Sequence, residues 1–121
     1  PVAYITGAWE FYGLPMTVTP DVLIPRMDTE VLVEEAVSRL EPGMRGFDLC
    51  TGSGCILIAL LALGGKNAPA ETLSGIGCDI SDEALDVACE NAVNNRVTAQ
   101  WIQGDLFAAL DEVAPAEGAF P

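Results

Sequence analysis

A glycine-rich turn and two aspartates are the residues of this sequence whose types and spacing suggest binding chemistry. The turn lies within residues 48–54 (Asp-Leu-Cys-Thr-Gly-Ser-Gly), and Asp79 and Asp105 follow it along the chain. Small residues let a backbone approach a ligand closely, and a carboxylate accepts hydrogen bonds from hydroxyl and amine groups. Each feature also has a purely structural interpretation, because glycine and aspartate are common in turns and helix caps.

The residues around the turn argue against two kinds of phosphate site. A dinucleotide-binding fingerprint would place its third glycine at position 57, where this sequence has Leu57. A phosphate-binding loop needs Gly-Lys-Ser/Thr after a strand, but Lys66 follows an expected helix and is succeeded by Asn67. Neither a pyrophosphate nor a triphosphate is therefore the preferred ligand.

A single adenosine group could contact the turn and both aspartates. Asp79 can accept hydrogen bonds from both ribose hydroxyls, which is the role of a carboxylate at this place in nucleoside-binding α/β folds. Asp105 can accept from the adenine amine while Leu106 or Phe107 packs on the ring. The coincidence of three candidate contacts carries more weight than any one of them.

The elements that must position these residues alternate between strand and helix. This order predicts an α/β fold with a parallel sheet, which is half of a doubly wound arrangement. We expect strands over residues 47–50, 73–80 and from 97 onward, with helices over 55–63 and 82–94. The glycine turn, Asp79 and Asp105 then each follow a strand, so all three lie at the carboxyl edge of the sheet.

The first part of the chain predicts a β-hairpin and a helix. Residues 1–25 alternate with period two on either side of Gly13-Leu14-Pro15, where we expect the turn, and residues 21–24 are extended between two prolines. From Asp28 the spacing becomes helical. The expected buried stripe of this helix is Val31, Leu32, Ala36, Val37 and Leu40, with Glu30, Glu34 and Glu35 toward water. The domain boundary is expected at residue 27, between a hairpin with its linker (1–27) and a ligand-binding domain (28–121).

Composition excludes several classes of function. The 121 residues include 5 basic and 18 acidic side chains, which give a net charge of −13 and argue against nucleic acid as a direct ligand. There is no histidine, so the chain holds no Ser-His-Asp triad and no His-ligated metal, and we expect no metal site.

The cysteines and the apolar runs bear on localisation. The four cysteines form no Cys-x-x-Cys pair and no signal segment opens the chain, so we expect buried free thiols in a cytoplasmic protein. The apolar run at residues 55–63 is far shorter than the ~20 residues that cross a bilayer, so no membrane span is expected. The chain starts at Pro1 and stops at residues 118–121, on the approach to another expected strand, which indicates a fragment.

The sequence resembles the HemK/PrmC family of S-adenosylmethionine-dependent protein-(glutamine) methyltransferases. The resemblance is carried by residues 22–30 (Val-Leu-Ile-Pro-Arg-Met-Asp-Thr-Glu), by 48–54 followed by Asp79, and by 104–107 (Gly-Asp-Leu-Phe). Residues 7–13 are also similar to the hairpin of that family. The resemblance implies a partial Rossmann-like class I methyltransferase fold, preceded by the hairpin, in which residues 26–30 close over the site.

The resemblance also implies the site, the cofactor and the partner. Residues 50–54 (Cys50, Thr51, Gly52, Ser53 and Gly54) would surround the methionine part of S-adenosylmethionine, Asp79 would hold its ribose, and Asp105 with Leu106 would hold its adenine. The substrate would be a glutamine side-chain amide in a peptide chain release factor. Its nitrogen would take the methyl group by direct displacement, which needs alignment and no covalent intermediate.

The sequence also departs from the family pattern. Cys50 and Met27 stand where glycine and a second proline are common, and the catalytic Asn-Pro-Pro-Tyr motif does not occur, so no catalytic residue is assigned in this chain. We therefore expect a cofactor-binding portion that does not turn over by itself. Two alternatives remain at this point, namely a non-catalytic nucleoside-binding module of the same fold and an NAD-dependent oxidoreductase.

Overall fold

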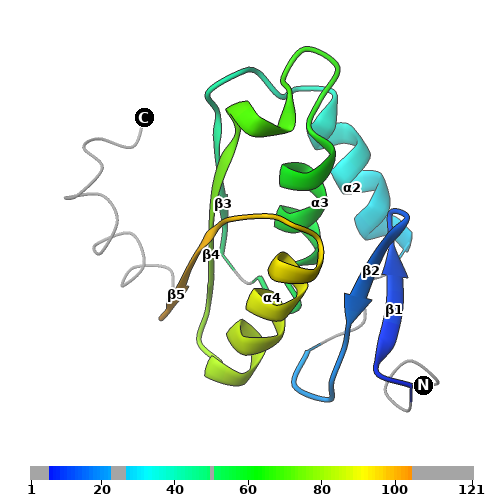
Figure 1. Ribbon diagram of the computed structural model, residues 1–121, viewed down its shortest axis with the longest axis vertical. Coiled ribbons are helices and arrows are strands. Elements are labelled where there is room, and N and C mark those ends of the chain that lie inside the picture. The colour runs from blue at the N-terminus through cyan, green and yellow to red at the C-terminus, as the bar shows by residue number, and fades with distance from the viewer. Residues whose placement is uncertain (1–5, 23–26, 50, 105–121) are drawn as a thin grey trace.

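The computed structural model describes residues 6–22, 27–49 and 51–104, and it consists of a three-stranded sheet, helices packed beside it and a separate hairpin (Figure 1). In chain order the elements are β1 (Ala8–Phe11), β2 (Leu14–Thr17), α2 (Met27–Val37), β3 (Arg45–Asp48), α3 (Cys55–Leu63), the 3-10 helix η1 (Ala70–Thr72), β4 (Ser74–Asp79), α4 (Asp82–Asn94) and β5 (Gln100–Gln103).

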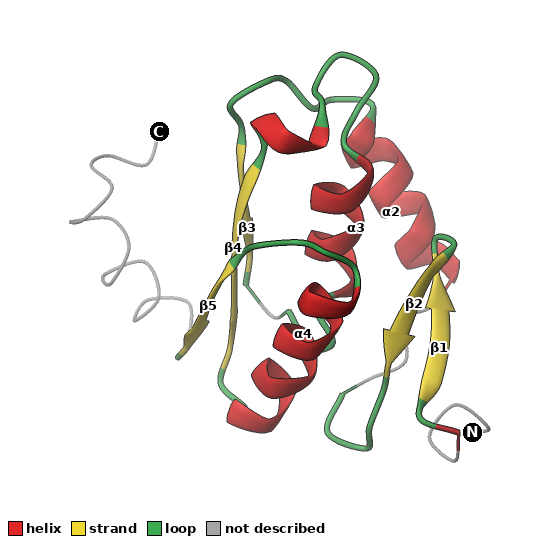
Figure 2. Ribbon diagram, viewed as in Figure 1, coloured by secondary structure: helices red, strands yellow, loops and turns green. Residues whose placement is uncertain are grey.

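The sheet has the order β3-β4-β5 and both of its strand pairs are parallel, as the sequence predicted. Helix α3 connects β3 to β4 and α4 connects β4 to β5, and both helices lie on the same face of the sheet (Figure 2). Both crossover connections run in the same direction across the sheet, and because both are expected to be right-handed, their helices lie on the same face. Strand β3 begins two residues before the expected position, and β5 begins only at Gln100, so Val97 and Ala99 precede it.

Two glycines in β4 allow close packing against its helix-covered face. A Cβ on Gly75 would lie 2.6 Å from Leu57 Cδ1 of α3, and a Cβ on Gly77 would lie 2.4 Å from Trp101 Cζ3 of β5. The strand forms here in spite of its poor intrinsic propensity because tertiary packing needs the missing side chains. On the opposite face, Ile76, Cys78 and Ile102 form a small buried cluster.

The hairpin forms as predicted, but its turn lies at Tyr12-Gly13 instead of Gly13-Leu14-Pro15. Phe11 pairs with Leu14 in an antiparallel register, which leaves a two-residue loop. Tyr12 (φ 52°) and Gly13 (φ 78°) both have positive φ, as the tightest hairpin turns require. Leu14 and Pro15 therefore belong to the second strand.

Helix α2 begins at Met27, so the expected cap residues Asp28 and Thr29 lie inside it, and it ends at Val37, before the expected Leu40. The predicted buried stripe is also partly wrong. Val31 and Leu32 are 63% and 56% exposed, whereas Val33 is completely buried and belongs to the main core cluster. The run Val31-Leu32-Val33 contains three apolar neighbours, and only contact with α3 decides which of them points inward. Glu34 and Glu35 face water as expected, while Glu30 is half-buried.

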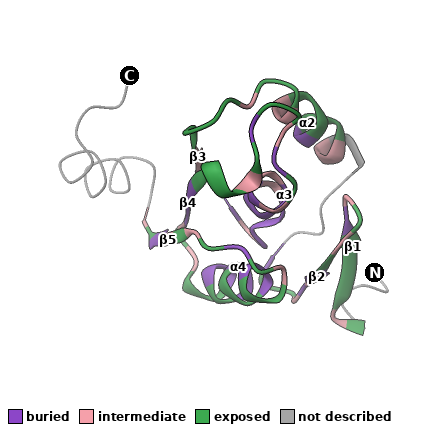
Figure 3. Ribbon diagram, turned by 45° about the horizontal axis from the view of Figure 1, so that its top comes forward, coloured by how far each residue is buried: buried purple, intermediate pink, exposed green. Residues whose placement is uncertain are grey.

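Helix α4 is predicted correctly at its cap and incorrectly at one buried position. The Ser81 hydroxyl accepts a hydrogen bond from the Ala84 N–H at 3.1 Å, the standard N-cap contact. Buried side chains line one side of the helix, including Leu85, Ala88 and Ala92 as expected (Figure 3). Cys89 is exposed, which corrects the expectation that it is a buried thiol; Cys55 and Cys78 are buried thiols as predicted.

None of the helices within the described ranges has the length and apolar character needed to cross a bilayer.

Candidate functional site

The glycine turn lies directly beyond the carboxyl end of β3 and is attached to β4. The Thr51 N–H donates to the Cys78 carbonyl at 2.9 Å, and the Gly54 N–H donates to the Thr51 carbonyl at 2.8 Å. Gly52 and Gly54 have φ of 53° and 80°, a region that glycine adopts without strain. The chain can therefore reverse sharply between strand β3 and helix α3.

The two glycines of the turn have opposite surroundings. A Cβ on Gly54 would lie 3.0 to 3.2 Å from Ile58, Ala88 and Trp101, so this glycine is needed for packing between α3, α4 and β5. A Cβ on Gly52 would meet no atom within 4 Å. Gly52 thus presents its backbone to open space, where a bound group can approach closely.

Asp79 lies at the carboxyl end of β4 and contacts the same turn. Its Oδ2 accepts from the Gly52 N–H at 3.0 Å, and its Oδ1 accepts from the Ser81 N–H at 3.0 Å. Asp79 therefore does have the structural role of a turn residue before α4. A carboxylate has about four acceptor positions, so each oxygen can still accept a hydrogen bond from a ligand hydroxyl.

The other side chains of the turn point into the protein. Thr51 and Ser53 are both buried, and the Thr51 hydroxyl donates to Asp48 Oδ2 at 3.0 Å. These two residues can offer a ligand only their backbone groups. Of the sequence-predicted site residues, the structure brings residues 51–54 together with Asp79; Cys50, Asp105 and Leu106 lie outside the described residues.

Cys55, the first residue of α3, is not a nucleophile. Burial raises the pKa of its thiol from 9.0 to about 11, and the hydrogen bond with Ser53 offsets this only in part. The thiol is the protonated, unreactive form near neutral pH. The chemistry of this edge of the sheet is therefore hydrogen bonding and backbone contact, not covalent catalysis by Cys55.

The contacts of two residues that organise this region were not predicted from the sequence. Glu30 was expected to face water, but its Oε2 accepts from the Tyr12 N–H at 2.5 Å and so joins α2 to the hairpin turn. Asn91 is completely buried in α4 and is bonded both to Thr17 and to Ser53. A polar residue at helical spacing from the buried Ala84 and Ala88 is a signal that could have identified Asn91.

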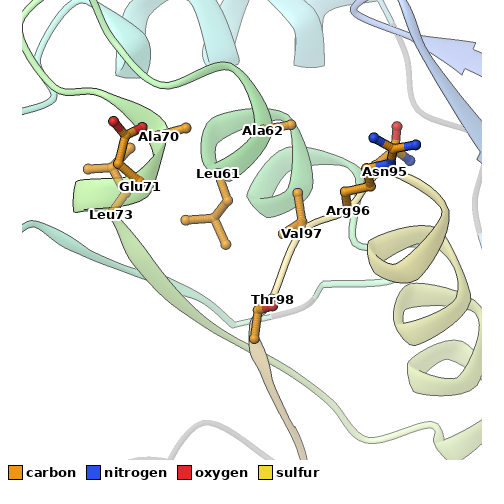
Figure 4. Close-up of a pocket in the computed structure, with 9 residues that line it drawn as sticks. All are labelled: Leu61, Ala62, Ala70, Glu71, Leu73, Asn95, Arg96, Val97 and Thr98. Carbon is orange, nitrogen blue, oxygen red and sulfur yellow. The ribbon is translucent and has the colours of Figure 1, made fainter.

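A hollow of about 480 Å³ lies elsewhere, at the opposite edge of the sheet (Figure 4). Leu61 and Ala62 from the end of α3 line it, together with Leu73 just before β4 and Thr98 before β5. These residues precede the strands, whereas the glycine turn and Asp79 follow them. The hollow is therefore separate from the candidate site.

Comparisons with known proteins agree with this geometry. No model of a known protein family matches the chain. It is 43% identical over 117 residues to the release factor glutamine methyltransferase of Thermodesulfovibrio yellowstonii, covering 93% of this chain and 40% of that protein. The corresponding enzyme of Fusobacterium nucleatum is 38% identical over 117 residues, covering 93% of this chain and 31% of that protein.

A solved structure with a similar fold is the Pyrococcus abyssi tRNA (uracil-54, C5)-methyltransferase in complex with S-adenosyl-L-homocysteine. It has a TM-score of 0.60 and 17% identity, and the match covers 81% of this chain and 23% of that one. The fold expectation, a partial Rossmann-like methyltransferase fold preceded by a hairpin, is confirmed. The chain spans only between 31% and 40% of the length of the two relatives named above. Over 93% of its length, this chain is therefore similar in sequence to proteins named release factor glutamine methyltransferase.

Proposed function

We propose that this chain is the cofactor-binding part of an S-adenosylmethionine-dependent methyltransferase that modifies a glutamine side-chain amide in a peptide chain release factor. The observation that supports this most directly is the hydrogen bond between Gly52 and Asp79. It places an open glycine backbone and a carboxylate side by side at the carboxyl edge of a parallel sheet, where α/β folds of this kind bind nucleosides.

The cofactor assignment rests on the relatives together with the fit of the residues present. S-adenosylmethionine supplies a methyl group on a sulfonium sulfur that an amide nitrogen can accept. Asp79 would accept hydrogen bonds from the ribose hydroxyls, and the backbone of residues 51–54 would border the methionine part. Cys50, Asp105 and Leu106, which lie outside the described residues, would complete the cofactor site.

The residues described here bind and orient; none of them is proposed to transfer a proton. Gly52 leaves space for the ligand because no side chain fills that position. The buried hydrogen bonds of Thr51 and Ser53 hold the turn in one conformation, which reduces the entropy that binding would otherwise cost. The residue that grips the glutamine amide is not assigned in this chain.

The division of the chain at residue 27 belongs to the same proposal. Residues 1–27 would form the hairpin and linker that precede the cofactor domain, and residues 28–121 would form the N-terminal half of that domain. The relatives do not favour either alternative, a non-catalytic nucleoside-binding module or an NAD-dependent oxidoreductase.

Calorimetric titration of the protein expressed from its complete reading frame tests the cofactor. We expect heat of binding with S-adenosylmethionine and none with NAD. Asp79→Asn should weaken binding about tenfold or more, because one carboxylate oxygen becomes an amide donor. Asp86→Asn, at an exposed carboxylate of helix α4, is the matched control and should leave binding unchanged. Heat with NAD alone, or equal affinities for the Asp79 and Asp86 variants, would refute the cofactor assignment.

A methylation assay tests the substrate. The complete protein is incubated with S-adenosylmethionine and a release factor, and the modified residue is located by peptide mass spectrometry. We expect one methyl group on a glutamine side chain. If the protein binds the cofactor but no methyl group is transferred to the release factor, the cofactor assignment stands and the substrate assignment fails.

A further inference from the structure

The carboxamide of Asn91 is the most completely buried polar side chain near the candidate site. Its exposed fraction is 0%, and every hydrogen-bonding group that it offers in the interior is used. Nδ2 donates to the Thr17 carbonyl at 3.0 Å and to the Ser53 carbonyl at 2.9 Å, and Oδ1 accepts from the Thr17 N–H at 2.6 Å. One amide therefore serves both the hairpin and the glycine turn.

The Asn91 carboxamide bonds Thr17 in the way that the backbone of a neighbouring β-strand would. Thr17 is the last residue of β2, and both its N–H and its C=O pair with the side-chain amide. Helix α4 lies between the hairpin and the sheet, so Asn91 can reach the outer edge of β2 on one side (Figure 1). Its second N–H is directed at the turn between β3 and α3.

The contact with Ser53 links this amide to the candidate ligand site. Ser53 lies between Gly52, which bonds Asp79, and Gly54, the N-cap residue of α3. A continuous series of hydrogen bonds thus runs from Thr17 through Asn91 and the turn to Asp79. Because the Ser53 side chain is buried, the Ser53 carbonyl can move only together with the rest of the turn.

Asparagine is the residue that fits these three partners. Two of them are carbonyl acceptors that need N–H donors, and one is an N–H donor that needs an acceptor. Aspartate would direct carboxylate oxygen at both carbonyls. Alanine would leave the buried Ser53 carbonyl and the half-buried N–H and C=O of Thr17 without this partner, which is destabilising. The amide is needed for its donor pattern and not for its volume.

We propose that Asn91 is a positioning residue that holds the glycine turn in its binding conformation and makes that conformation depend on attachment of the hairpin. This inference rests on the proposed function, because it identifies residues 51–54 with the cofactor site. It adds that the hairpin contributes to cofactor affinity through one buried amide.

Amide hydrogen exchange on the unliganded protein from the complete reading frame is the first measurement. Asn91→Asp should accelerate exchange of the Gly52 and Gly54 amides at least about tenfold, because the turn loses its attachment. Asn95→Ala is the matched control. The Asn95 side chain also bonds the hairpin, through the Pro15 carbonyl at 2.9 Å, but it makes no bond to the turn. We expect it to leave exchange at Gly52 and Gly54 unchanged.

Calorimetry with S-adenosylmethionine is the second measurement. Asn91→Asp should weaken binding about tenfold or more, and Asn95→Ala should change it less than about twofold. If Asn91→Asp fails to fold, Thr17→Pro replaces it. That variant removes the hairpin-side donor and leaves both partners of the Asn91–Ser53 bond in place, so the proposal still expects faster exchange at Gly52.

The outcomes separate the two proposals. Unchanged exchange and affinity in the Asn91 variant, or normal Gly52 exchange in Thr17→Pro, would overturn the positioning role. Failure of the wild type to bind S-adenosylmethionine would overturn the proposed function, while the exchange experiment would still report whether Asn91 holds the turn.

Discussion

Gly52 and Asp79 are 27 positions apart in the sequence, yet the N–H of one donates to the carboxylate of the other at 3.0 Å. The turn after β3 and the side chain after β4 are consequently held as one unit. A substitution of Asp79 therefore affects a candidate ligand contact and the conformation of the turn together. Variants that distinguish a loss of ligand contact from a loss of packing must therefore be made at other positions.

The two glycines of the turn provide that separation. Gly52→Ala places a methyl group in open space, so it should lower cofactor affinity strongly while costing only the ~1 kcal/mol of a left-handed alanine. Gly54→Ala adds contacts of 3.0 to 3.2 Å with three packed side chains, so it should mainly reduce the free energy of unfolding. Urea denaturation and calorimetric titration of both variants check this. A Gly52 variant with normal affinity would show that the ligand does not lie against this residue.

Glu30 should stabilise the hairpin turn through its hydrogen bond to Tyr12. Glu30→Ala leaves the half-buried Tyr12 N–H without its charged acceptor and should reduce the free energy of unfolding by about 1–3 kcal/mol. Glu30→Gln retains a carbonyl acceptor and should lose less. Glu34→Ala, at an exposed position of the same helix, is the control. Equal losses for the Glu30 and Glu34 alanine variants in urea denaturation would contradict a specific role for Glu30.

The described cysteines should differ in reactivity. Cys89 is exposed, whereas Cys55 and Cys78 are buried, so iodoacetamide should modify Cys89 first and the other two only on unfolding. Peptide mass spectrometry after timed alkylation, with and without urea, measures the order. Rapid modification of Cys55 in the native protein would mean that the start of α3 opens readily.

The raised pKa of Cys55 also predicts a change of stability with pH. The folded state favours the neutral thiol, because its pKa is about 11 in place of 9.0. The stabilisation is thus complete below about pH 9 and is lost as pH rises from about 9 to 11, by about 2 kcal/mol. Urea denaturation at about pH 8 and about pH 10.5 should show a smaller loss for Cys55→Ala than for the wild type. Parallel pH dependence of the two proteins would contradict this prediction.

Strand β4 should tolerate no side chain at Gly77. Gly77→Ala places a Cβ 2.4 Å from the Trp101 ring and should destabilise the fold by about 1–3 kcal/mol through overpacking. In a Trp101→Ala background the same substitution should cost less, because the clash with the ring is removed. Strictly additive losses in thermal denaturation would show that the ring is not the obstacle.

The sequence predicted those parts of the fold that follow from local pattern. Helix α3 over residues 55–63, the Ser81 cap of α4 and the strand-helix order all agree with the structure, because periodicity and capping are local signals. The glycine turn and Asp79 could be placed at one edge of the sheet because parallel strands share that edge.

The features that the sequence did not predict depend on contacts between distant segments. Nothing in the run Val31-Leu32-Val33 indicates that only Val33 packs on α3. The alternation around residue 13 is compatible with more than one turn position, and strand pairing selects Tyr12-Gly13. Asn91 is a polar residue in an otherwise apolar stripe, and its partners, Thr17 and Ser53, are known only from the folded chain.

The separation of 74 residues between Thr17 and Asn91 has a consequence for biosynthesis. During translation the hairpin leaves the ribosome early, but its partner amide is synthesised much later. Until α4 has formed, Thr17 lacks this amide, and the hairpin is held only by earlier contacts such as the hydrogen bond between Tyr12 and Glu30. The contact with Asn91 is therefore a late attachment of the hairpin, and it completes the hydrogen bonds around Ser53.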